Sequence, residues 1–255
     1  MLAKGYRVLC VGSGGVRGLA FIGALKKVDY SCIEEYHGIS IGSIISMCLA
    51  IGYSPSDLEE LAIKTDYRKL VKFSAENIFN FKEKRGVMNV DGLRIFLGEL
   101  LKAKGYDPKC KLSEVPKLGV VVSNLNEHRG ELWKGTEDGV VDTVLASSAI
   151  PLMFEPYVKE GKYYVDGCLY VDCASELNEK PNECYSLMLE SDDGYDVGKS
   201  LGKYLESILQ GPRRDRCKKY MLSRPEGSYK VIRLNGVNTM DFDMSNEEKK
   251  RIIEN

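Results

Sequence analysis

The pentapeptide Gly38-Ile39-Ser40-Ile41-Gly42 decides the interpretation of this sequence, because it sets a hydroxyl between two glycines immediately before an apolar run. The run from Ser43 to Ile51 predicts a helix that ends at Gly52. A serine on a sharp turn from a strand into a helix has an exposed Oγ, and small neighbours let the chain pass close to it. The spacing therefore predicts a nucleophile elbow in which Ser40 is the nucleophile.

Strands and helices are predicted to alternate on both sides of this elbow. A β-rich run from Tyr6 to Val11 leads into a glycine cluster at residues 12–18, and Leu19 to Val28 is predicted to be helical. The uninterrupted β-branched run from Leu118 to Val122 is typical of a parallel strand buried on both faces. Further strands are expected at 162–165, 184–189 and 229–234, and further helices at 54–61 (with Ser56 or Asp57 as the cap), 90–104, 138–147, 200–209 and 247–253.

This alternation predicts an α/β fold with a mostly parallel sheet sandwiched between helices. We expect residues 1–255 to form a single domain, because neither a repeat nor a linker interrupts the chain. The motifs lie in residues 5–175, and the segments of residues 184–255 are expected to complete the same domain.

The composition limits the possible classes of function. Lys and Arg total 36 against 37 Asp and Glu, so the net charge is −1 and we expect no nucleic-acid partner. The eight cysteines have no close-paired spacing and are interpreted as reduced thiols. No apolar run has signal-peptide character or reaches about 18 residues, so we expect a cytoplasmic protein whose membrane contacts are transient and at the surface. No residue set has metal-ligand spacing, and we expect neither a metal nor a cofactor.

Acyl transfer by a serine requires a base for its proton and donors for the oxyanion. The glycine loop after the first strand can direct successive N–H groups into one concavity, so Gly14 and Gly15 are the expected oxyanion donors. Arg17 either orients this loop or is an ordinary surface arginine.

A carboxylate is the better candidate for the base, because the chain has only two histidines. His37 lies three residues before Ser40 and is expected to pack beside the elbow, and His128 lies in a polar turn. Asp166 follows an aromatic strand at the strand's C-terminal end, where open α/β sheets gather their ligands. The dipeptide Asp166-Gly167 is by itself also an ordinary turn signal.

Taken together, these motifs resemble the patatin-like phospholipase family. The resemblance rests on the glycine loop, the elbow, Ser147-Ser148-Ala149-Ile150-Pro151 and Asp166-Gly167, and Met240 to Ser245 is similar to the family's C-terminal region. It implies a patatin-like fold and a Ser–Asp dyad that hydrolyses acyl esters of lipids, with Ser40 as nucleophile, Asp166 as base and the glycine loop as oxyanion hole. The glycines of these motifs are Gly12, Gly18, Gly38, Gly42 and Gly167.

Two positions depart from the family's pattern. Ser13 stands where the family usually has the first glycine of its loop, and a serine would be strained there if the position required a positive φ. Cys168 follows Asp166-Gly167 where the family commonly has glycine or alanine, and its side chain is small enough to fit.

The partner implied by the resemblance is a lipid or another fatty-acyl ester. Leu152, Met153 and Phe154 could form an apolar wall for the acyl chain or could be core residues. Basic stretches at 64–72, 82–85 and 211–219 could contact an anionic lipid surface, although such runs are usually solvated. Two alternatives remain. One is a nucleotide-binding protein, although Arg17 interrupts the G-x-G-x-x-G spacing, and the other is an inactive patatin-like scaffold that binds lipid.

Overall fold

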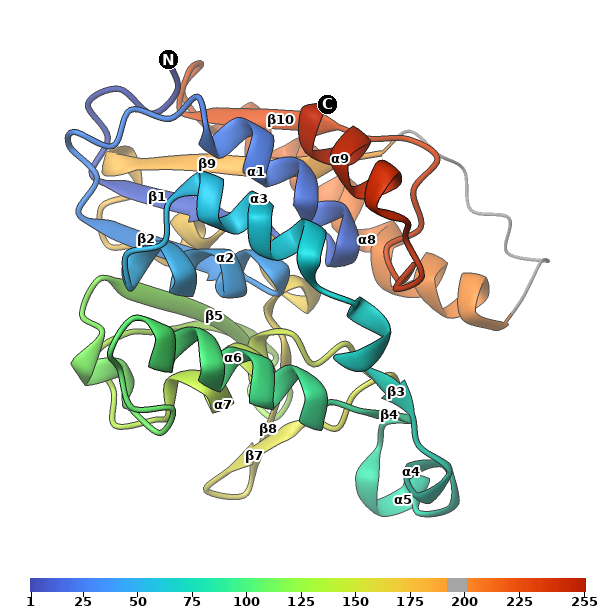
Figure 1. Ribbon diagram of the computed structural model, residues 1–255. Helices are drawn as coiled ribbons and strands as arrows, with labels where there is room; N and C mark the ends of the chain where they lie inside the picture. Colours follow the sequence, from blue (N-terminus) through green and yellow to red (C-terminus); the bar gives the residue numbers. More distant parts are fainter. Residues whose placement is uncertain (192–200) are drawn as a thin grey trace.

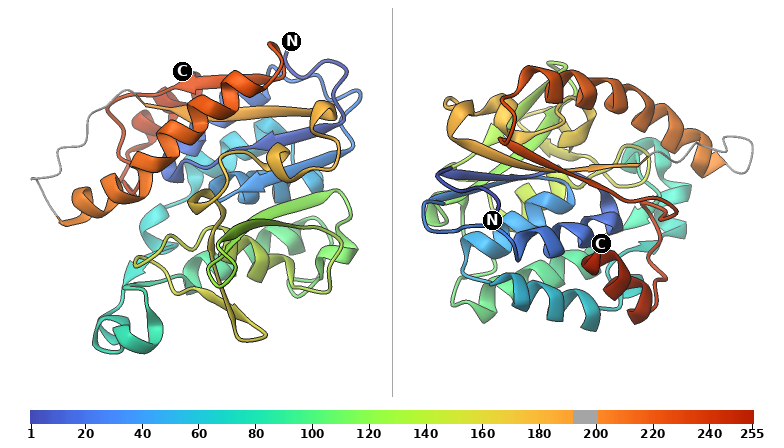
Figure 2. Two further views of the ribbon diagram at one scale, coloured as in Figure 1. Left: turned by 180° about the vertical axis from the view of Figure 1, so that it is seen from behind. Right: turned by 90° about the horizontal axis from the view of Figure 1, so that it is seen from above.

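The computed structural model describes residues 1–191 and 201–255, and its centre is a mixed sheet with helices on both faces (Figures 1 and 2). The sheet has the order β10-β9-β1-β2-β5-β8-β7, with β6 paired to β5. The strands are β1 (Val8–Val11), β2 (Glu35–Ile39), β5 (Leu118–Asn124), β6 (Arg129–Trp133), β7 (Tyr157–Lys159), β8 (Lys162–Asp166), β9 (Cys184–Glu190) and β10 (Tyr229–Arg233). The run from β10 to β5 is parallel, whereas β6, β7 and β8 pair antiparallel. The expected α/β fold with a mostly parallel sheet is confirmed.

Helices cover the two faces unequally. The helices are α1 (Leu19–Leu25), α2 (Ile41–Ala50), α3 (Pro55–Lys64), α4 (Ala75–Phe79), α5 (Phe81–Lys84), α6 (Asp91–Ala103), α7 (Val140–Ser147), α8 (Leu201–Ser223) and α9 (Asn246–Glu254). The larger core packs α1, α2, α3 and α9 against one face, where Phe21, Met47 and Ile252 are completely buried. The smaller core lies under α8 on the other face and includes Cys10 and Tyr220. All eight cysteines are free thiols, as the sequence indicated.

Three expectations about the elements need correction. The cap of α3 is Ser54, whose side chain accepts from the N–H of Asp57 at 3.1 Å while the Asp57 carboxylate accepts from the N–H of Ser54 at 2.8 Å. The helix expected at 200–209 does not end there: α8 continues through Gly211-Pro212 to Ser223, and Ser200, its expected first residue, lies outside the described residues. β5 is buried throughout, but only one of its partners, β2, is parallel.

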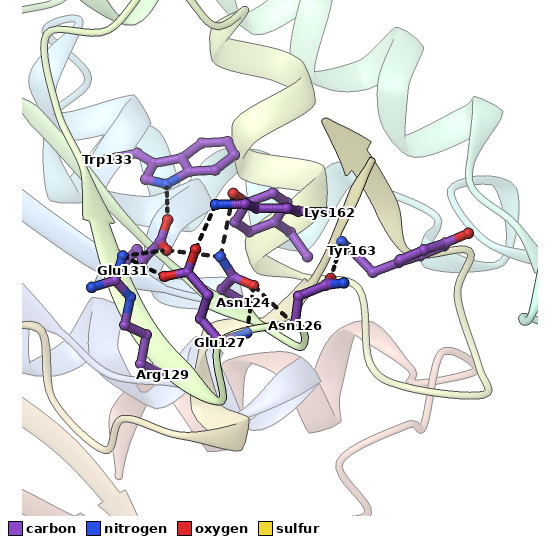
Figure 3. A network of polar contacts seen from close by, with 9 residues as sticks. Asn124, Asn126, Glu127, Arg129, Glu131, Trp133, Lys162 and Tyr163 are labelled. Atoms are coloured by element: carbon purple, nitrogen blue, oxygen red, sulfur yellow. Dashed lines mark hydrogen bonds and ion pairs between the residues drawn. The ribbon is translucent and has the colours of Figure 1, made fainter. Parts of the chain in front are cut away.

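A polar network holds β8 against the hairpin of β5 and β6 (Figure 3). Asn124 accepts from the N–H groups of Asn126 and Glu127 and donates to Glu131 at 2.9 Å. The start of β8 joins the network, because Lys162 pairs with Glu127 and the N–H of Tyr163 donates to Asn126 at 2.8 Å. These contacts fix the strand whose last residue is Asp166.

A small lobe projects from the body between α3 and α6 (Figures 1 and 2). We use "the lobe" for residues 72–89, which form the two-stranded stem β3 (Lys72–Phe73) and β4 (Met88–Asn89) with α4 and α5 between them. A separate apolar cluster, including Val71, Met88 and Phe154, packs the stem against the segment that follows α7. Within the described residues, no helix combines the length and the hydrophobicity needed to cross a membrane.

Candidate active site

Ser40 lies on the turn between β2 and α2 in a strained backbone conformation. Its φ of 56° and ψ of −126° fall in a region that L-residues rarely adopt, and its side chain is only 5 % exposed. Such outliers persist where the surrounding structure enforces them, and they gather at active sites. The sharp turn predicted from Gly38-Ile39-Ser40-Ile41-Gly42 is therefore present.

The glycines around Ser40 are required by close approaches of the backbone. A Cβ on Gly42 would lie 2.2 Å from the carbonyl oxygen of Val11 and 2.5 Å from that of Gly12. A Cβ on Gly38 would lie 2.2 Å from the carbonyl oxygen of Gly42. Gly18 leaves room for the Ile41 side chain, which a Cβ would approach to 2.6 Å. The elbow and the glycine loop therefore pack directly on each other.

Ser147 holds the elbow by its side chain, a role that we did not foresee from the sequence. Its Oγ accepts from the N–H of Ser40 at 3.0 Å and donates to the carbonyl of Val121 at 2.6 Å. The hydroxyl of Ser43 donates to the Ser40 carbonyl at 2.6 Å. The only signal in the sequence was that Ser147 begins the motif Ser147-Ser148-Ala149-Ile150-Pro151.

Asp166 reaches Ser40 because β2 and β8 share one edge of β5. Ile39 pairs with Val121 and Asp166 pairs with the next residue, Val122, while β6 occupies the other edge at both positions. Asp166 is the last residue of its strand, as expected, but β8 runs antiparallel to β5 and enters from beyond the C-terminal edge of the parallel strands. It therefore ends where β2 ends. Gly167 permits this approach, since a Cβ there would lie 2.5 Å from the Val121 carbonyl oxygen.

The buried carboxylate of Asp166 has the electrostatic character of a base. Burial raises its pKa above the ordinary value, because desolvation disfavours the charged form. The N–H of Cys168, which donates to Oδ1 at 2.9 Å, the Ser40 hydroxyl and the charge of Arg213 lower it. In the part of the chain that the structure describes, Oδ2 has no hydrogen-bond partner. The Ser40 contribution places its hydroxyl near this carboxylate, and contacts of this kind in a site often tighten only when substrate is bound.

The two histidines lie in environments other than the site around Ser40. His37 is buried, with Nε2 2.9 Å from Glu35 Oε2 and Nδ1 3.4 Å from Asn178 Nδ2. His128 is exposed on the turn between β5 and β6, with a positive φ of 53°. Neither is among the residues that line the cavity in front of Ser40.

The glycine loop leaves two N–H groups without an acceptor. The N–H of Gly12 donates to the Leu187 carbonyl at 2.9 Å and that of Val16 to the Thr239 carbonyl at 3.0 Å. Between them, the N–H groups of Gly14 and Gly15 make no hydrogen bond to any described residue. Gly15 needs to be glycine, since its φ is 55° and a Cβ would lie 2.3 Å from the Thr239 carbonyl oxygen.

The two departures from the family's pattern are neighbours. Ser13 is buried but is not among the described residues with positive φ, so the expected strain is not present. Burial and the Asp166 carboxylate raise the pKa of the Cys168 thiol well above its ordinary value, and a hydrogen bond with Ser13 lowers it. The thiol is therefore protonated and unreactive at neutral pH.

Arginines near the site are buried. Arg17, which the sequence left open as a loop or surface residue, is 9 % exposed. In the basic stretch of α8, Arg213 is buried and Arg216 donates to Asp172 at 3.1 Å and to the Cys168 carbonyl at 3.0 Å. These two side chains therefore stabilise the segment after Asp166 and are not free to meet a lipid surface.

A cavity of about 550 Å³ opens in front of Ser40 and is lined largely by aliphatic side chains of α1, α2, α3, α6 and α7. Gly15, Ser40 and Ser148 also line it, as do the charged residues Asp91, Arg94, Asp142 and Glu155. Of the three residues proposed as an acyl wall, only Phe154 lines the cavity. Leu152 has a φ of 69° and is 43 % exposed, and Met153 packs with the stem of the lobe. In the described residues, no group of three or more His, Cys, Asp or Glu side chains could hold a metal ion.

A strained serine on the turn from a parallel strand into a helix has the geometry of the nucleophile elbow of α/β-type serine hydrolases. The chain belongs to the patatin-like phospholipase family, whose model matches residues 9–172. The viral protein "Uncharacterized protein R571" of Acanthamoeba polyphaga mimivirus is 32 % identical over 171 residues, covering 62 % of this chain and 57 % of that protein. "Probable lipid hydrolase 463L" of Invertebrate iridescent virus 6 is 24 % identical over 196 residues, covering 71 % and 67 %.

Two solved structures share the fold. VipD from Legionella pneumophila superposes with a TM-score of 0.59 at 17 % identity, over 98 % of this chain and 65 % of that chain. The type III effector ExoU of Pseudomonas aeruginosa gives a TM-score of 0.53 at 12 % identity, over 98 % and 51 %. The chain thus spans only about half to two thirds of these proteins.

Proposed function

We propose that this chain hydrolyses carboxylic esters of lipids through an acyl-enzyme on Ser40, with Asp166 as the base. The observation that carries the proposal is the Ser40 hydroxyl on its strained turn near the buried carboxylate of Asp166, whose Oδ2 has no hydrogen-bond partner among the described residues. The membership in the patatin-like phospholipase family and the viral relative named as a probable lipid hydrolase support it.

In the proposed reaction, Oδ2 of Asp166 takes the Ser40 proton as Oγ attacks the ester carbonyl carbon. The carbonyl oxygen becomes an oxyanion, which the N–H groups of Gly14 and Gly15 stabilise because no described residue accepts from them. The tetrahedral intermediate collapses, the C–O bond of the ester breaks, and the leaving alkoxide takes the proton from Asp166. Water then attacks the acyl-enzyme with Asp166 again acting as the base, which releases a carboxylic acid and restores Ser40.

The cavity supports an acyl chain as the part of the substrate that is bound. Most of its lining residues are apolar and Ser40 is among them, so an acyl chain lying in the cavity would bring its ester group to the nucleophile.

The test is labelling with a fluorophosphonate probe, which reports an activated serine without assuming a substrate. Ser40→Ala should abolish both labelling and the hydrolysis of a fatty-acyl ester. Ser46→Ala is the matched control, because Ser46 lies on the same helix α2 and its buried hydroxyl has no hydrogen-bond partner among the described residues. This control should label like the parent protein.

Two results would contradict the proposal. Equal labelling of Ser40→Ala and the parent would show that another serine reacts. A folded parent protein that neither labels nor hydrolyses esters would support the inactive scaffold instead.

A further inference from the structure

We propose that the lobe, residues 72–89, is a docking surface for the anionic surface of a lipid bilayer. This inference rests on the proposed function, because it identifies the surface from which the lipid substrate would reach the cavity. The lobe combines large exposed apolar side chains, uncompensated positive charge and a direct structural link to the catalytic site.

The lobe exposes apolar side chains that its own packing does not use. The chain has seven phenylalanines, and the three exposed ones, Phe73, Phe79 and Phe81, all lie in the lobe. Phe73 is 74 % exposed and Phe79 is 89 % exposed, and Ile78 beside it is half exposed. Exposed apolar residues that occur singly are ordinary, but a cluster of aromatic residues on one projection marks an interaction surface.

The lobe is a built structure, so these side chains are held outward. Ser74 caps α4 by accepting from the N–H of Asn77 at 3.1 Å, and the buried Asn77 amide donates to the Met88 carbonyl at 3.1 Å. Met88 of the stem is buried in the apolar cluster that also contains Val71 and Phe154, whereas Phe73 of the stem lies outside this cluster. The same short segment thus separates its inner from its outer apolar residues, and the outer ones belong to no apolar cluster of the described residues.

The charge of the lobe complements an anionic lipid surface. Four basic side chains stand against two acidic ones, which gives residues 72–89 a net charge of +2 in a chain whose total is −1. Lys84 pairs with Glu155 at 3.3 Å, and Arg85 lies over the Tyr163 ring. Lys72 and Lys82 have no ion pair or hydrogen bond to the described residues. Lysines beside aromatic side chains are typical of segments that insert at the level of anionic headgroups.

The lobe is continuous with the cavity. The N–H groups of Val87 and Met88 both donate to the Met153 carbonyl, and Gly86 passes so close to Phe154 that a Cβ would lie 2.3 Å from its carbonyl carbon. Phe154 and Val71 line the cavity, and Ala149 of the same cluster accepts from the N–H of Asp166 at 2.9 Å. Leu152, exposed and bridged to Gly86, extends the apolar surface toward the body. A bilayer bound by the lobe would therefore lie next to the cavity.

A second copy of the chain is a poorer occupant of this surface. In a symmetric dimer the same patch meets itself, so the lysines of one lobe would face those of the other. A bilayer that contains anionic lipid can bury the aromatic side chains and attract the lysines.

The experiment measures binding without turnover, by co-sedimentation of the Ser40→Ala protein with vesicles. Vesicles of phosphatidylcholine alone are compared with vesicles of phosphatidylcholine and phosphatidylglycerol in equal amounts. We expect stronger binding to the second kind, and binding that weakens as salt is added, because salt screens the lysines. Added to this background, Phe79→Ser should weaken binding at least about tenfold through the lost burial of its ring. Lys72→Glu with Lys82→Glu should weaken it on the order of thirtyfold.

Matched controls separate the lobe from general effects. Leu222→Ser on α8 removes a side chain that is 88 % exposed, and Lys109→Glu with Lys117→Glu makes the same charge change elsewhere on the surface. Both should bind vesicles like the background protein, and circular dichroism should show that all variants are folded.

Three results would overturn the inference: no binding of the parent chain to either kind of vesicle, equal weakening by the lobe variants and their controls, or a lobe variant that dissociates a dimer and leaves vesicle binding unchanged. The proposed function fails separately, when binding depends on the lobe but Ser40 does not label with the fluorophosphonate probe.

Discussion

The elbow at residues 38–42 and the lobe at residues 72–89 differ in what explains their residues. In the elbow every small residue is explained from inside the protein, because a Cβ on Gly38 or Gly42 would strike a neighbouring backbone carbonyl. In the lobe the large residues Phe73 and Phe79 contribute little to the interior and lie in solvent. Under the two proposals, the elbow residues serve the geometry of a reaction site, whereas the outer lobe residues serve the surface to which the lobe binds.

The largest effect is expected at the base. Asp166→Asn keeps the acceptor for the Cys168 N–H but removes the negative charge, so ester hydrolysis should fall by about 10²–10⁴ with the fold intact. His128→Gln and His37→Asn serve as controls and should stay near the parent rate, since His128 is exposed on a turn and His37 is bound to Glu35 and Asn178. A large loss in either histidine variant would indicate a triad in place of the dyad.

The same substitution should stabilise the protein at neutral pH. Burial raises the pKa of Asp166 in the folded protein above its ordinary value of 3.8. Between 3.8 and this raised pKa, the folded protein therefore binds more protons than the unfolded chain. The contribution of Asp166 to stability is therefore present below 3.8 and is lost as pH rises through the folded pKa. The free energy of unfolding, measured with urea from acid to neutral pH, should rise for Asp166→Asn relative to the parent as pH increases from 3.8 to the folded pKa. Above the folded pKa the difference between the two proteins should stay constant. If the difference in free energy of unfolding between the variant and the parent does not change with pH, the charge of Asp166 is not its cause.

A methyl group at the elbow should damage the fold. Gly42→Ala places a Cβ against the carbonyl oxygens of Val11 and Gly12, which are backbone atoms of the central sheet and cannot easily move. We expect a loss of about 2–3 kcal/mol in the free energy of unfolding. Gly211→Ala is the control, because that helical glycine has open space around it and should gain about 0.5–1 kcal/mol. Equal stability of the two variants would refute the close packing of the elbow on the glycine loop.

Relief of the strain at Ser40 should be measurable in the absence of activity. Ser40→Ala and Ser40→Gly both remove the nucleophile, but only glycine adopts a φ of 56° and a ψ of −126° readily. The glycine variant should therefore be the more stable by about 1 kcal/mol in denaturant unfolding. If alanine were as stable as glycine, the backbone at Ser40 would not be strained in solution.

The elbow could be predicted because its turn depends on neighbouring residues. The hydrogen bond that holds it could not be predicted, because its two residues are far apart in the sequence. Gly-x-Ser-x-Gly before an apolar helix specifies its own turn, so Ser40 and the glycine loop could be found directly. The hydrogen bond between the Ser40 N–H and Ser147 joins residues 107 positions apart, and no local pattern announces it. Asp166 was placed at a strand end, but the antiparallel direction of β8 depends on pairing with β5 that the segment itself does not specify.

The lobe was not predicted and α8 was predicted too short, for different reasons. The strands of the lobe's stem are two residues each, too short to show a period, and α4 and α5 are single turns. In α8 the pair Gly211-Pro212 signals the end of a helix, yet the helix continues, with Cys217 and Tyr220 buried against the sheet. Tertiary packing overrides the local propensity there.

The smallest change in stability is expected for an exposed residue of the lobe, and a small change is the result that supports the proposal. Because Phe79 is 89 % exposed, Phe79→Ser should change the free energy of unfolding by no more than about 0.5 kcal/mol. Met88→Ala, on the inner side of the same lobe and 5 % exposed, should cost about 2–5 kcal/mol. Chemical denaturation of the two variants tests the separation of inner from outer residues without any lipid present. A cost for Phe79→Ser as large as that for Met88→Ala would show that the ring is packed in solution, and the outer lobe would then need no partner to explain it.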